Sequence, residues 1–346
     1  MITNSVASET NAGGGAGAPR RVAAVDCGTN SIRLLISEVD AAGAVGEAGQ
    51  AGQVGGAREI SRRNTIVRLG QGVDETGRFN PEAIERTRQA LAGYVEEMER
   101  EGVSGLRMVA TSATRDAANR EDFFAMTREL LGRVQPGAQA EVISGEEEAA
   151  LSFVGATADL EPERGPACVI DLGGGSTEFV MQTGGGLRAK STQMGCVRVT
   201  ERFMRTDPPT EEETERARAY IRERIAEAAA VVPFDQARTF VGCAGTFTTL
   251  SALAQGLPEY DPARIHMSEV PFTRMREVTA RLRSQTAAQR LEDPVMHPGR
   301  ADVIGSGATV VEEMMGAFEA AANAISFVIS EKDILDGIVA ELARAS

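Results

Sequence analysis

Short apolar runs alternate with helical patterns along the whole chain. In the first half they predict strands at 22–26, 32–38, 58–69, 106–111 and 139–143. The early strands are joined by hairpin-type connections and should be antiparallel, whereas the later ones alternate with helices, as in a parallel sheet. The Gly- and Ala-rich stretch 41–57 is predicted to be a flexible hairpin loop.

Capping residues mark the helices of the first half. Asn80 precedes Pro81, which suits a first helical position, and Asn119 and Ser144 are expected to cap two further helices. After Pro81, apolar residues recur on one helical face, which we expect to pack on the first sheet: Ile84, Leu91, Tyr94, Val95 and Met98. The first lobe should close near residue 157.

The pattern restarts after the turn-rich segment 161–166. It predicts strands at 167–171, 177–182, 187–193, 238–242 and 324–329, and helices over 245–253 and from Ala301 to about Phe318. Thr210 and Glu213 fit a capping box. The last amphipathic segment has no further strand to serve, so we expect it to cross back onto the first lobe. The predicted division is a disordered tail (1–20), two lobes (21–157 and 158–333) and a C-terminal helix (334–346).

Both halves open with the same local sequence, an apolar strand, an Asp-X-Gly turn with small hydroxyl residues, and a second strand. The first copy runs from Asp26 to Ser31 and the second from Asp171 to Thr177. Such a turn leaves backbone N–H groups unpaired and has no Cβ to block a phosphate oxygen, while its carboxylate can hold a metal or a water. One copy alone would be an ordinary hairpin turn. Two copies imply facing lobes with phosphate between them.

Composition narrows the class of protein. The length of 346 residues favours two domains, and 42% hydrophobic residues suffice for a core in each. A net charge of −14 disfavours nucleic-acid binding. The two histidines, His266 and His297, both lie beside loop signals, which argues against a His-rich metal site or a Ser-His-Asp triad. Four cysteines without a Cys-X-X-Cys pair indicate reduced core residues. With no apolar run long enough for a bilayer, we expect a soluble cytoplasmic protein.

The run from Ser144 to Glu148 contains three consecutive glutamates. Capping by Ser144 and the favourable helix dipole could explain all three without chemistry. A phosphohydrolase with almost no histidine, however, needs a carboxylate to orient or deprotonate its water. The residues alone do not choose among Glu146, Glu147 and Glu148.

Arginine is the side chain expected to meet an anionic substrate. Arg115 follows a predicted strand end, where the loops of open α/β sheets meet ligands. The segment 241–246 is another strand that ends in glycines before a helix, which fits either a plain turn or an anion contact. Further arginines near the predicted cleft, several of them expected on the surface, are Arg33, Arg62, Arg63, Arg68 and Arg198.

From about residue 21 to its end, the chain resembles the exopolyphosphatase / guanosine pentaphosphate phosphatase family of the actin–Hsp70–sugar-kinase superfamily. The segments that carry the resemblance are 26–33, 111–115, 143–149, 169–178, 194–196, 242–247 and 298–302. The resemblance implies an α/β fold of two actin-like (ribonuclease H-like) lobes with an interlobe cleft. A simple doubly wound dinucleotide fold fits less well, because each half opens with a hairpin.

The resemblance also assigns roles. Glu148 aligns with the catalytic glutamate, and Asp26 and Asp171 align with aspartates that act in catalysis near magnesium, so that all three are expected around the metal. The expected substrate-binding residues are Gly28, Thr29, Asn30, Ser31, Arg33, Arg115, Gly173, Gly174, Gly175, Ser176, Thr177 and Glu178. Mg²⁺ or another divalent cation is the implied cofactor, with K⁺ as a further candidate, and family members are often homodimers.

The expected activity is hydrolysis of the terminal phosphoanhydride of inorganic polyphosphate. Because the chain ends after one helix beyond Asp333, without the additional helical domain of longer members, short polyphosphates or a nucleotide become better candidates. The alternatives are hydrolysis of the 5′ γ-phosphate of guanosine pentaphosphate (pppGpp), a kinase of the same superfamily, and a non-catalytic alarmone-binding regulator. The glutamate at 148 argues against the last.

Overall fold

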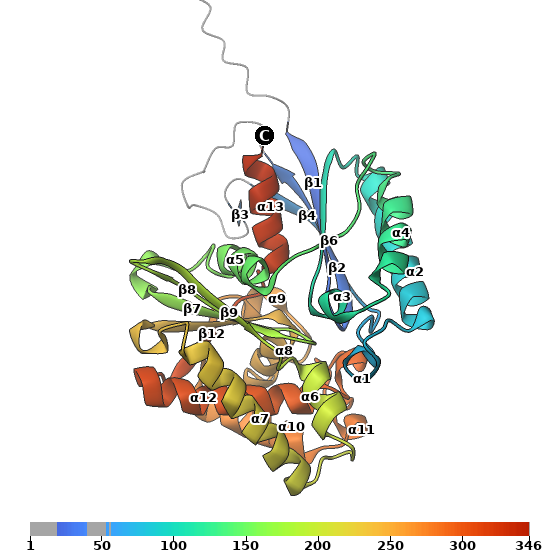
Figure 1. Ribbon diagram of the computed structural model, residues 1–346. Helices are drawn as coiled ribbons and strands as arrows, with labels where there is room; N and C mark the ends of the chain where they lie inside the picture. The colour runs from blue at the N-terminus through green and yellow to red at the C-terminus, as the bar shows by residue number, and fades with distance from the viewer. Residues whose placement is uncertain (1–18, 40–52, 55–56, 346) are drawn as a thin grey trace, which may run out of the picture.

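The computed structural model describes residues 19–39, 53–54 (backbone only) and 57–345. Most of the predicted tail and of the predicted loop 41–57 therefore lies outside the described residues. The described part forms two lobes, each built on one mixed sheet with helices on its faces (Figure 1). The predicted two-lobe α/β architecture is confirmed.

The first sheet has the strand order β3-β4-β2-β1-β5-β6. Pairing is antiparallel from β4 through β2 to β1 and parallel from β1 through β5 to β6, as the pattern predicts. Its strands are β1 (Arg20–Cys27), β2 (Ser31–Val39), β3 (Gln53–Val54), β4 (Ala57–Ile66), β5 (Gly105–Ala110) and β6 (Glu141–Val142). The helices of this half are α1 (Val73–Thr76), α2 (Pro81–Arg100), α3 (Ser112–Asp116), α4 (Arg120–Leu131) and α5 (Gly145–Ala156).

The second sheet has the order β11-β12-β10-β7-β8-β9. Its strands are β7 (Ala167–Leu172), β8 (Thr177–Thr183), β9 (Gly186–Thr192), β10 (Thr239–Cys243), β11 (Ser268–Pro271) and β12 (Ser326–Ile329). The helices are α6 (Cys196–Phe203), α7 (Glu211–Ala229), α8 (Ala244–Ala254), α9 (Pro262–Ile265), α10 (Phe272–Ser284), α11 (Ala287–Arg290), α12 (Ile304–Ala322) and α13 (Ile334–Arg344). Three 3-10 turns, η1 (Pro162–Arg164), η2 (Phe234–Gln236) and η3 (Pro298–Arg300), complete the described elements.

The two sheets repeat one topology. The order β4-β2-β1-β5-β6 in the first lobe returns as β9-β8-β7-β10-β12 in the second, with the same strand directions. The central strand carries Asp26 in one lobe and Asp171 in the other. The doubled sequence motif therefore occupies equivalent places in a duplicated unit.

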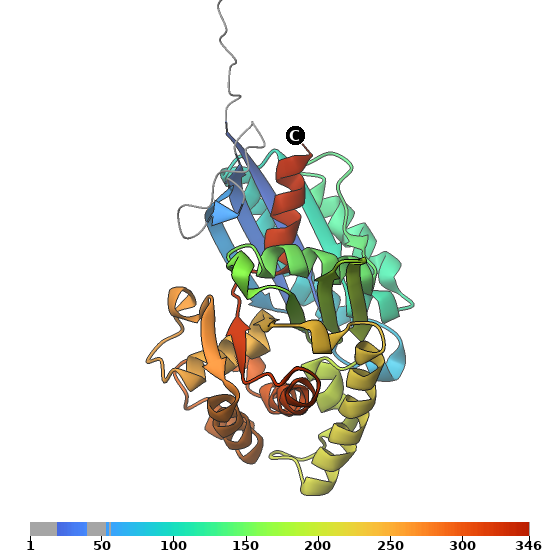
Figure 2. The same ribbon diagram turned by 90° about the vertical axis from the view of Figure 1, so that its left-hand side faces the viewer.

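The helix at the end of each half packs on the sheet of the other half. Helix α5 buries Ala149 and Ala156 against strands β7, β8 and β10, and α13 buries Ile338 and Val339 against β1 and β2. Figures 1 and 2 show these two helices against each other between the sheets. The lobes are thus joined by an exchange of helices on the faces that look toward each other.

Several predicted boundaries were wrong, each for a local reason. The strand predicted over 58–69 ends at Ile66, because the N–H groups of Val67 and Arg68 turn to the Asn30 carbonyl at 3.0 and 2.8 Å. A short strand, β3, lies within the predicted loop 41–57 and pairs with β4. The helix expected from Ala301 begins at Ile304, because Pro298–Arg300 forms a separate 3-10 turn.

The predicted helix N-caps are confirmed, except for Asn119. The side chains of Asn80, Ser144 and Thr210 accept first-turn N–H groups of their helices. Asn119 precedes α4 but caps nothing; its amide bonds both backbone groups of Phe79 instead. Strand β11 was not predicted, since its four residues are mostly polar.

All four cysteines are buried free thiols, as predicted. None of the helices in the described part is long and apolar enough to cross a membrane.

Candidate active site

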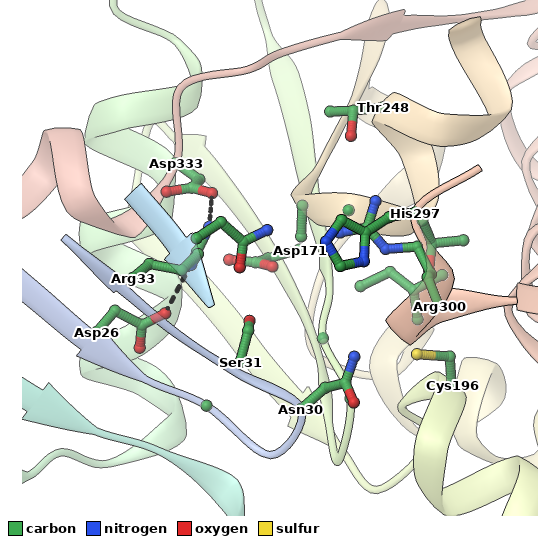
Figure 3. Close-up of a pocket in the computed structure, with 18 of the residues that line it drawn as sticks. Asp26, Asn30, Ser31, Arg33, Asp171, Cys196, Thr248, His297, Arg300 and Asp333 are labelled. Carbon is green, nitrogen blue, oxygen red and sulfur yellow. Dashed lines mark hydrogen bonds and ion pairs between the residues drawn. The ribbon is translucent and has the colours of Figure 1, made fainter. Parts of the chain in front are cut away.

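A cavity of about 590 Å³ lies between the two lobes. The first lobe contributes its Asp-X-Gly turn and part of β4, and the second lobe contributes its own turn, the start of α8 and the loop 294–300. Figure 3 shows Asp26, Ser31 and Asn30 approaching from one side and His297 and Arg300 from the other. The two copies of the motif therefore face one space, as the sequence implied.

The two turns have the same internal hydrogen bond. The Gly28 N–H donates to the Ser31 carbonyl at 2.9 Å, and the Gly173 N–H donates to the Ser176 carbonyl at 3.1 Å. Within the described residues, no acceptor is found for the N–H groups between these positions, those of Thr29, Asn30, Gly174 and Gly175. Unpaired backbone donors on a cavity wall are the expected partners of phosphate oxygens.

The carbonyl groups of the turns, by contrast, are bonded by neighbouring segments. The Asn30 carbonyl accepts the two N–H groups after β4, and the Gly174 carbonyl accepts from Val197 and Arg198 at 2.9 and 3.1 Å. The first N–H groups of helix α6 thus donate hydrogen bonds to carbonyls of the second turn. The turn carbonyls are therefore hydrogen-bonded within the protein, whereas the unpaired N–H groups of the turns remain available to a ligand.

Gly175, in the second turn, also allows the two lobes to pack closely against each other. A Cβ at Gly175 would lie 2.5 Å from Thr29 Oγ1 and 2.6 Å from Ser112 Oγ, whereas one at Gly28 would meet nothing nearer than 3.7 Å. Gly175 is therefore required by the close approach of the two lobes, which the sequence could not reveal.

The aspartates of the two turns have cross-strand neighbours of opposite charge type, a basic residue in the first lobe and an acidic residue in the second. Across the hairpin, Asp26 pairs in register with Arg33 and Asp171 pairs with Glu178. Arg33 lies 2.7 Å from Asp26 Oδ2 and also forms an ion pair with Asp333, as the dashed lines of Figure 3 mark. The duplicated position thus holds a cation in the first lobe and a carboxyl in the second.

Burial sets the protonation of these carboxyls. It raises the pKa of Asp171 to about 6, helped by the charge of Asp333 and opposed by the hydrogen bond from Ser152 at 2.6 Å. It raises the pKa of Glu178 well above the ordinary value, with Glu148 and Asp171 adding to the effect. Burial also raises the pKa of Asp26, against the pull of Arg33.

Among the three consecutive glutamates, only Glu148 is buried and lines the cavity. Its Oε2 lies 2.8 Å from Arg115 Nη1, which also bonds the Ile143 carbonyl at 3.0 Å. Burial raises the pKa of Glu148 to about 7, with Arg115 opposing and Asp171 and Asp26 adding to the shift. A carboxyl with this pKa can take a proton from water near neutral pH.

Carboxylates gather around the cavity without forming a preassembled metal site. Within the described residues, no three His, Cys, Asp or Glu side chains are grouped as ligands. Even so, Asp26 Oδ1 is buried without a partner in the described part, and Asp171 lines the same cavity. Free carboxylate oxygens are the donors that Mg²⁺ prefers, so the residues fit such an ion.

Other cavity residues were not singled out from the sequence. Arg300 lines the cavity and has no carboxylate partner among the described residues, although its Nη1 donates to Thr249 Oγ1 at 2.7 Å. His297 and Tyr260 lie on the same wall. The segment 298–302 is part of the family resemblance, but neither periodicity nor spacing marks Arg300.

Most of the predicted site residues meet in this cavity. The wall includes Asp26, Gly28, Thr29, Asn30, Ser31, Arg33, Glu148, Asp171, Gly173, Gly174, Gly175 and Ser176. Arg115, Thr177 and Glu178 are not among the lining residues. Arg115 contacts Glu148, Thr177 Oγ1 donates to the Met194 carbonyl at 3.2 Å, and Glu178 accepts from Ser191 at 2.7 Å.

Comparison with known proteins agrees with this geometry. The profile of the Ppx/GppA phosphatase family matches residues 50–342. The chain is 52% identical over 323 residues to a Mycobacterium tuberculosis protein named exopolyphosphatase 2, covering 93% of this chain and 98% of that protein.

Solved structures give the same picture. An exopolyphosphatase-like protein superimposes with a TM-score of 0.84 at 40% identity, covering 94% of this chain and 99% of the other. An Aquifex aeolicus member of the Ppx/GppA family superimposes with a TM-score of 0.74 at 30% identity, covering 95% and 99%. The duplicated lobes, the facing turns and these matches together show that the chain belongs to the Ppx/GppA phosphatase family.

Proposed function

We propose that this protein is an exopolyphosphatase that hydrolyses the terminal phosphoanhydride bond of inorganic polyphosphate and releases orthophosphate. One observation carries the proposal: two turns with unpaired N–H groups and the buried Glu148 line the same cavity. The name of the Mycobacterium tuberculosis relative supports polyphosphate as substrate.

In this mechanism the terminal phosphoryl group lies between the two turns. Their N–H groups and Arg33 bind its oxygens, and Glu148 orients the attacking water and accepts its proton. Arg115 holds Glu148 through the 2.8 Å ion pair, so that the carboxylate stays directed at the cavity. Catalysis of this kind is mostly positioning and electrostatic stabilisation of the transferring group.

Membership in this family implies dependence on a divalent cation. We propose Mg²⁺, held by Asp26 and Asp171 with Glu148 beside them, and K⁺ as a further candidate ion. When bound, Mg²⁺ would neutralise negative charge on the phosphoryl oxygens. Asp26 Oδ1, which is buried and unpaired in the described structure, is the atom that most directly suits this role.

The test is release of orthophosphate from polyphosphates of defined length in the presence of Mg²⁺, with chain shortening followed on gels. Stepwise removal of terminal units supports the proposal. Phosphate release without an added acceptor also excludes a kinase. No release above the background of a Glu148→Gln variant, at any chain length, would overturn it.

A second candidate substrate is pppGpp. The observation in its favour is the apolar part of the cavity wall, formed by Tyr260, Val295 and Met296, together with Arg300, which lines the same cavity and has no carboxylate partner in the described part of the chain. Such a wall suits a nucleoside next to the phosphate turns. Parallel assays on pppGpp and on polyphosphate, compared by kcat/KM, decide between the two substrates. Tight nucleotide binding without turnover would indicate a regulator.

We also propose that the protein is a homodimer, to be tested by light scattering after gel filtration.

A further inference from the structure

Arg198, on α6, connects the second turn to the first lobe. Its guanidinium is almost entirely buried, and its Nε donates to the Gly175 carbonyl at 2.8 Å. The two Nη atoms reach the other lobe, where one pairs with Asp74 of α1 and the other lies 2.5 Å from Asp116 Oδ2 of α3. One side chain therefore bonds a phosphate-binding turn and two helices of the opposite lobe.

Helix α3 extends this connection to the glutamate. Ser112, at its start, accepts a hydrogen bond from Arg198 Nη2 at 3.3 Å. One turn later in the same helix, Arg115 holds Glu148 at 2.8 Å. A continuous set of contacts thus runs from the Gly175 carbonyl through Arg198 and α3 to Glu148.

We propose that Arg198 is a positioning residue, which fixes the second phosphate-binding turn relative to Glu148 by bonding the turn and α3 at once. The planar guanidinium has enough fixed N–H groups to satisfy all of these partners, and it keeps its charge when buried. Its removal would take one of two donors from the Gly175 carbonyl, which also accepts from the Gly195 N–H at 3.1 Å, and would leave Asp116 without an ion-pair partner in the described part of the chain. The kinetic part of this inference rests on the proposed function, whereas the structural part does not.

The neighbouring Arg202 provides a matched control. It lies one helical turn further along α6 and also pairs with Asp74, at 2.6 Å. Its side chain is 36% exposed and bonds neither Gly175 nor α3. A residue that only adds interlobe attraction should behave like Arg202.

The experiment compares Arg198→Gln with Arg202→Gln in the full chain. Hydrogen exchange should become faster in peptides covering 110–117 and 172–178 of Arg198→Gln, and stay unchanged in 326–329. We expect kcat for phosphate release to fall at least about tenfold with a smaller change in KM, because displaced catalytic groups cost mainly turnover. Arg202→Gln should stay within about twofold of wild type, as expected for an exposed pair.

Two further variants keep the result decisive. Asp116→Asn should lower kcat, and combining it with Arg198→Gln should cost less than the sum of the two effects, since both break the same contact. If Arg198→Gln fails to fold, Arg198→Lys keeps a charge for Asp74 but cannot also reach the Gly175 carbonyl, and the same exchange pattern is expected.

Unchanged exchange in both turn and α3 peptides, or a kcat for Arg198→Gln within about twofold of wild type, would overturn the inference. A wild-type protein that releases no phosphate would instead refute the proposed function. The exchange pattern would still test the connection in that case.

Discussion

At the scale of the residue, Glu148 shows how neighbours define a role. It shares a helical turn with Glu146 and Glu147, yet only Glu148 is buried, lines the cavity and is paired with Arg115. Glu147 is exposed and instead pairs with Arg107 at 2.6 Å. Glu148 and Glu147 thus lie on different faces of one helical turn, so that the first is a candidate base and the second forms a surface ion pair.

Replacing Glu148 by Gln keeps the side-chain volume and removes the proton acceptor. We expect kcat for phosphate release to fall by about 10²–10⁴, the usual contribution of a general base. The exposed Glu147→Gln should retain near-wild-type activity. Equal losses in the two variants would show that the helix turn, and not the base, had been disturbed, so the melting temperature of each should be measured alongside the kinetics.

At the scale of the element, the crossing of α5 and α13 depends on two glycines. A Cβ at Gly155 would overlap the Asp333 carbonyl, and one at Gly337 would overlap the Leu151 carbonyl. Backbone atoms cannot rotate away as a side chain can. The close approach of these helices holds Asp333 near Arg33, so the crossing also shapes the cavity.

Gly337→Ala should therefore lower the free energy of unfolding by at least about 1–3 kcal/mol, the range for overpacking. Gly316, within α12, is a matched control because a Cβ there would meet nothing within 4 Å. Gly316→Ala should stabilise the protein by about 0.8–1 kcal/mol, since alanine is the better helix former. Urea denaturation measures both, and equal effects of the two substitutions would contradict this account of the crossing.

At the scale of the whole molecule, buried carboxyls make stability depend on pH. The pKa of Asp171 rises to about 6 and that of Glu148 to about 7, both through burial, so the folded state holds protons that the unfolded chain releases near its ordinary acidic pKa. This stabilisation is complete below the unfolded pKa and is lost as the pH rises through the folded pKa.

In EDTA, the free energy of unfolding should therefore fall between pH 5.5 and pH 8, by roughly 1 kcal/mol or more. Glu148→Gln should reduce this pH dependence because it removes one titrating group. Adding Mg²⁺ at pH 8 should recover stability, since an ion bound by the carboxylates favours the folded state. A stability that is flat or rises over this range would contradict the assignment of protonated, buried carboxyls.

The sequence by itself determined the elements and their duplication. Two Asp-X-Gly turns in equivalent hairpins, the cap at Ser144 and the antiparallel-then-parallel order all follow from local chemistry: apolar periodicity, turn residues and capping oxygens act over a few neighbouring positions. Those signals were enough to predict two lobes facing a phosphate site, and the resemblance selected Glu148.

Only the tertiary structure decided which groups meet. In the folded chain Glu148 is buried and Glu147 is exposed, and Arg300 lies in the cavity wall. Arg115 forms its ion pair with Glu148. The tertiary structure also required Gly175 to be small because Thr29 of the other lobe lies against it. Burial, pKa and lobe contact depend on residues that are distant in the chain, such as Arg115 and Glu148 or Thr29 and Gly175, and no local pattern records such neighbours.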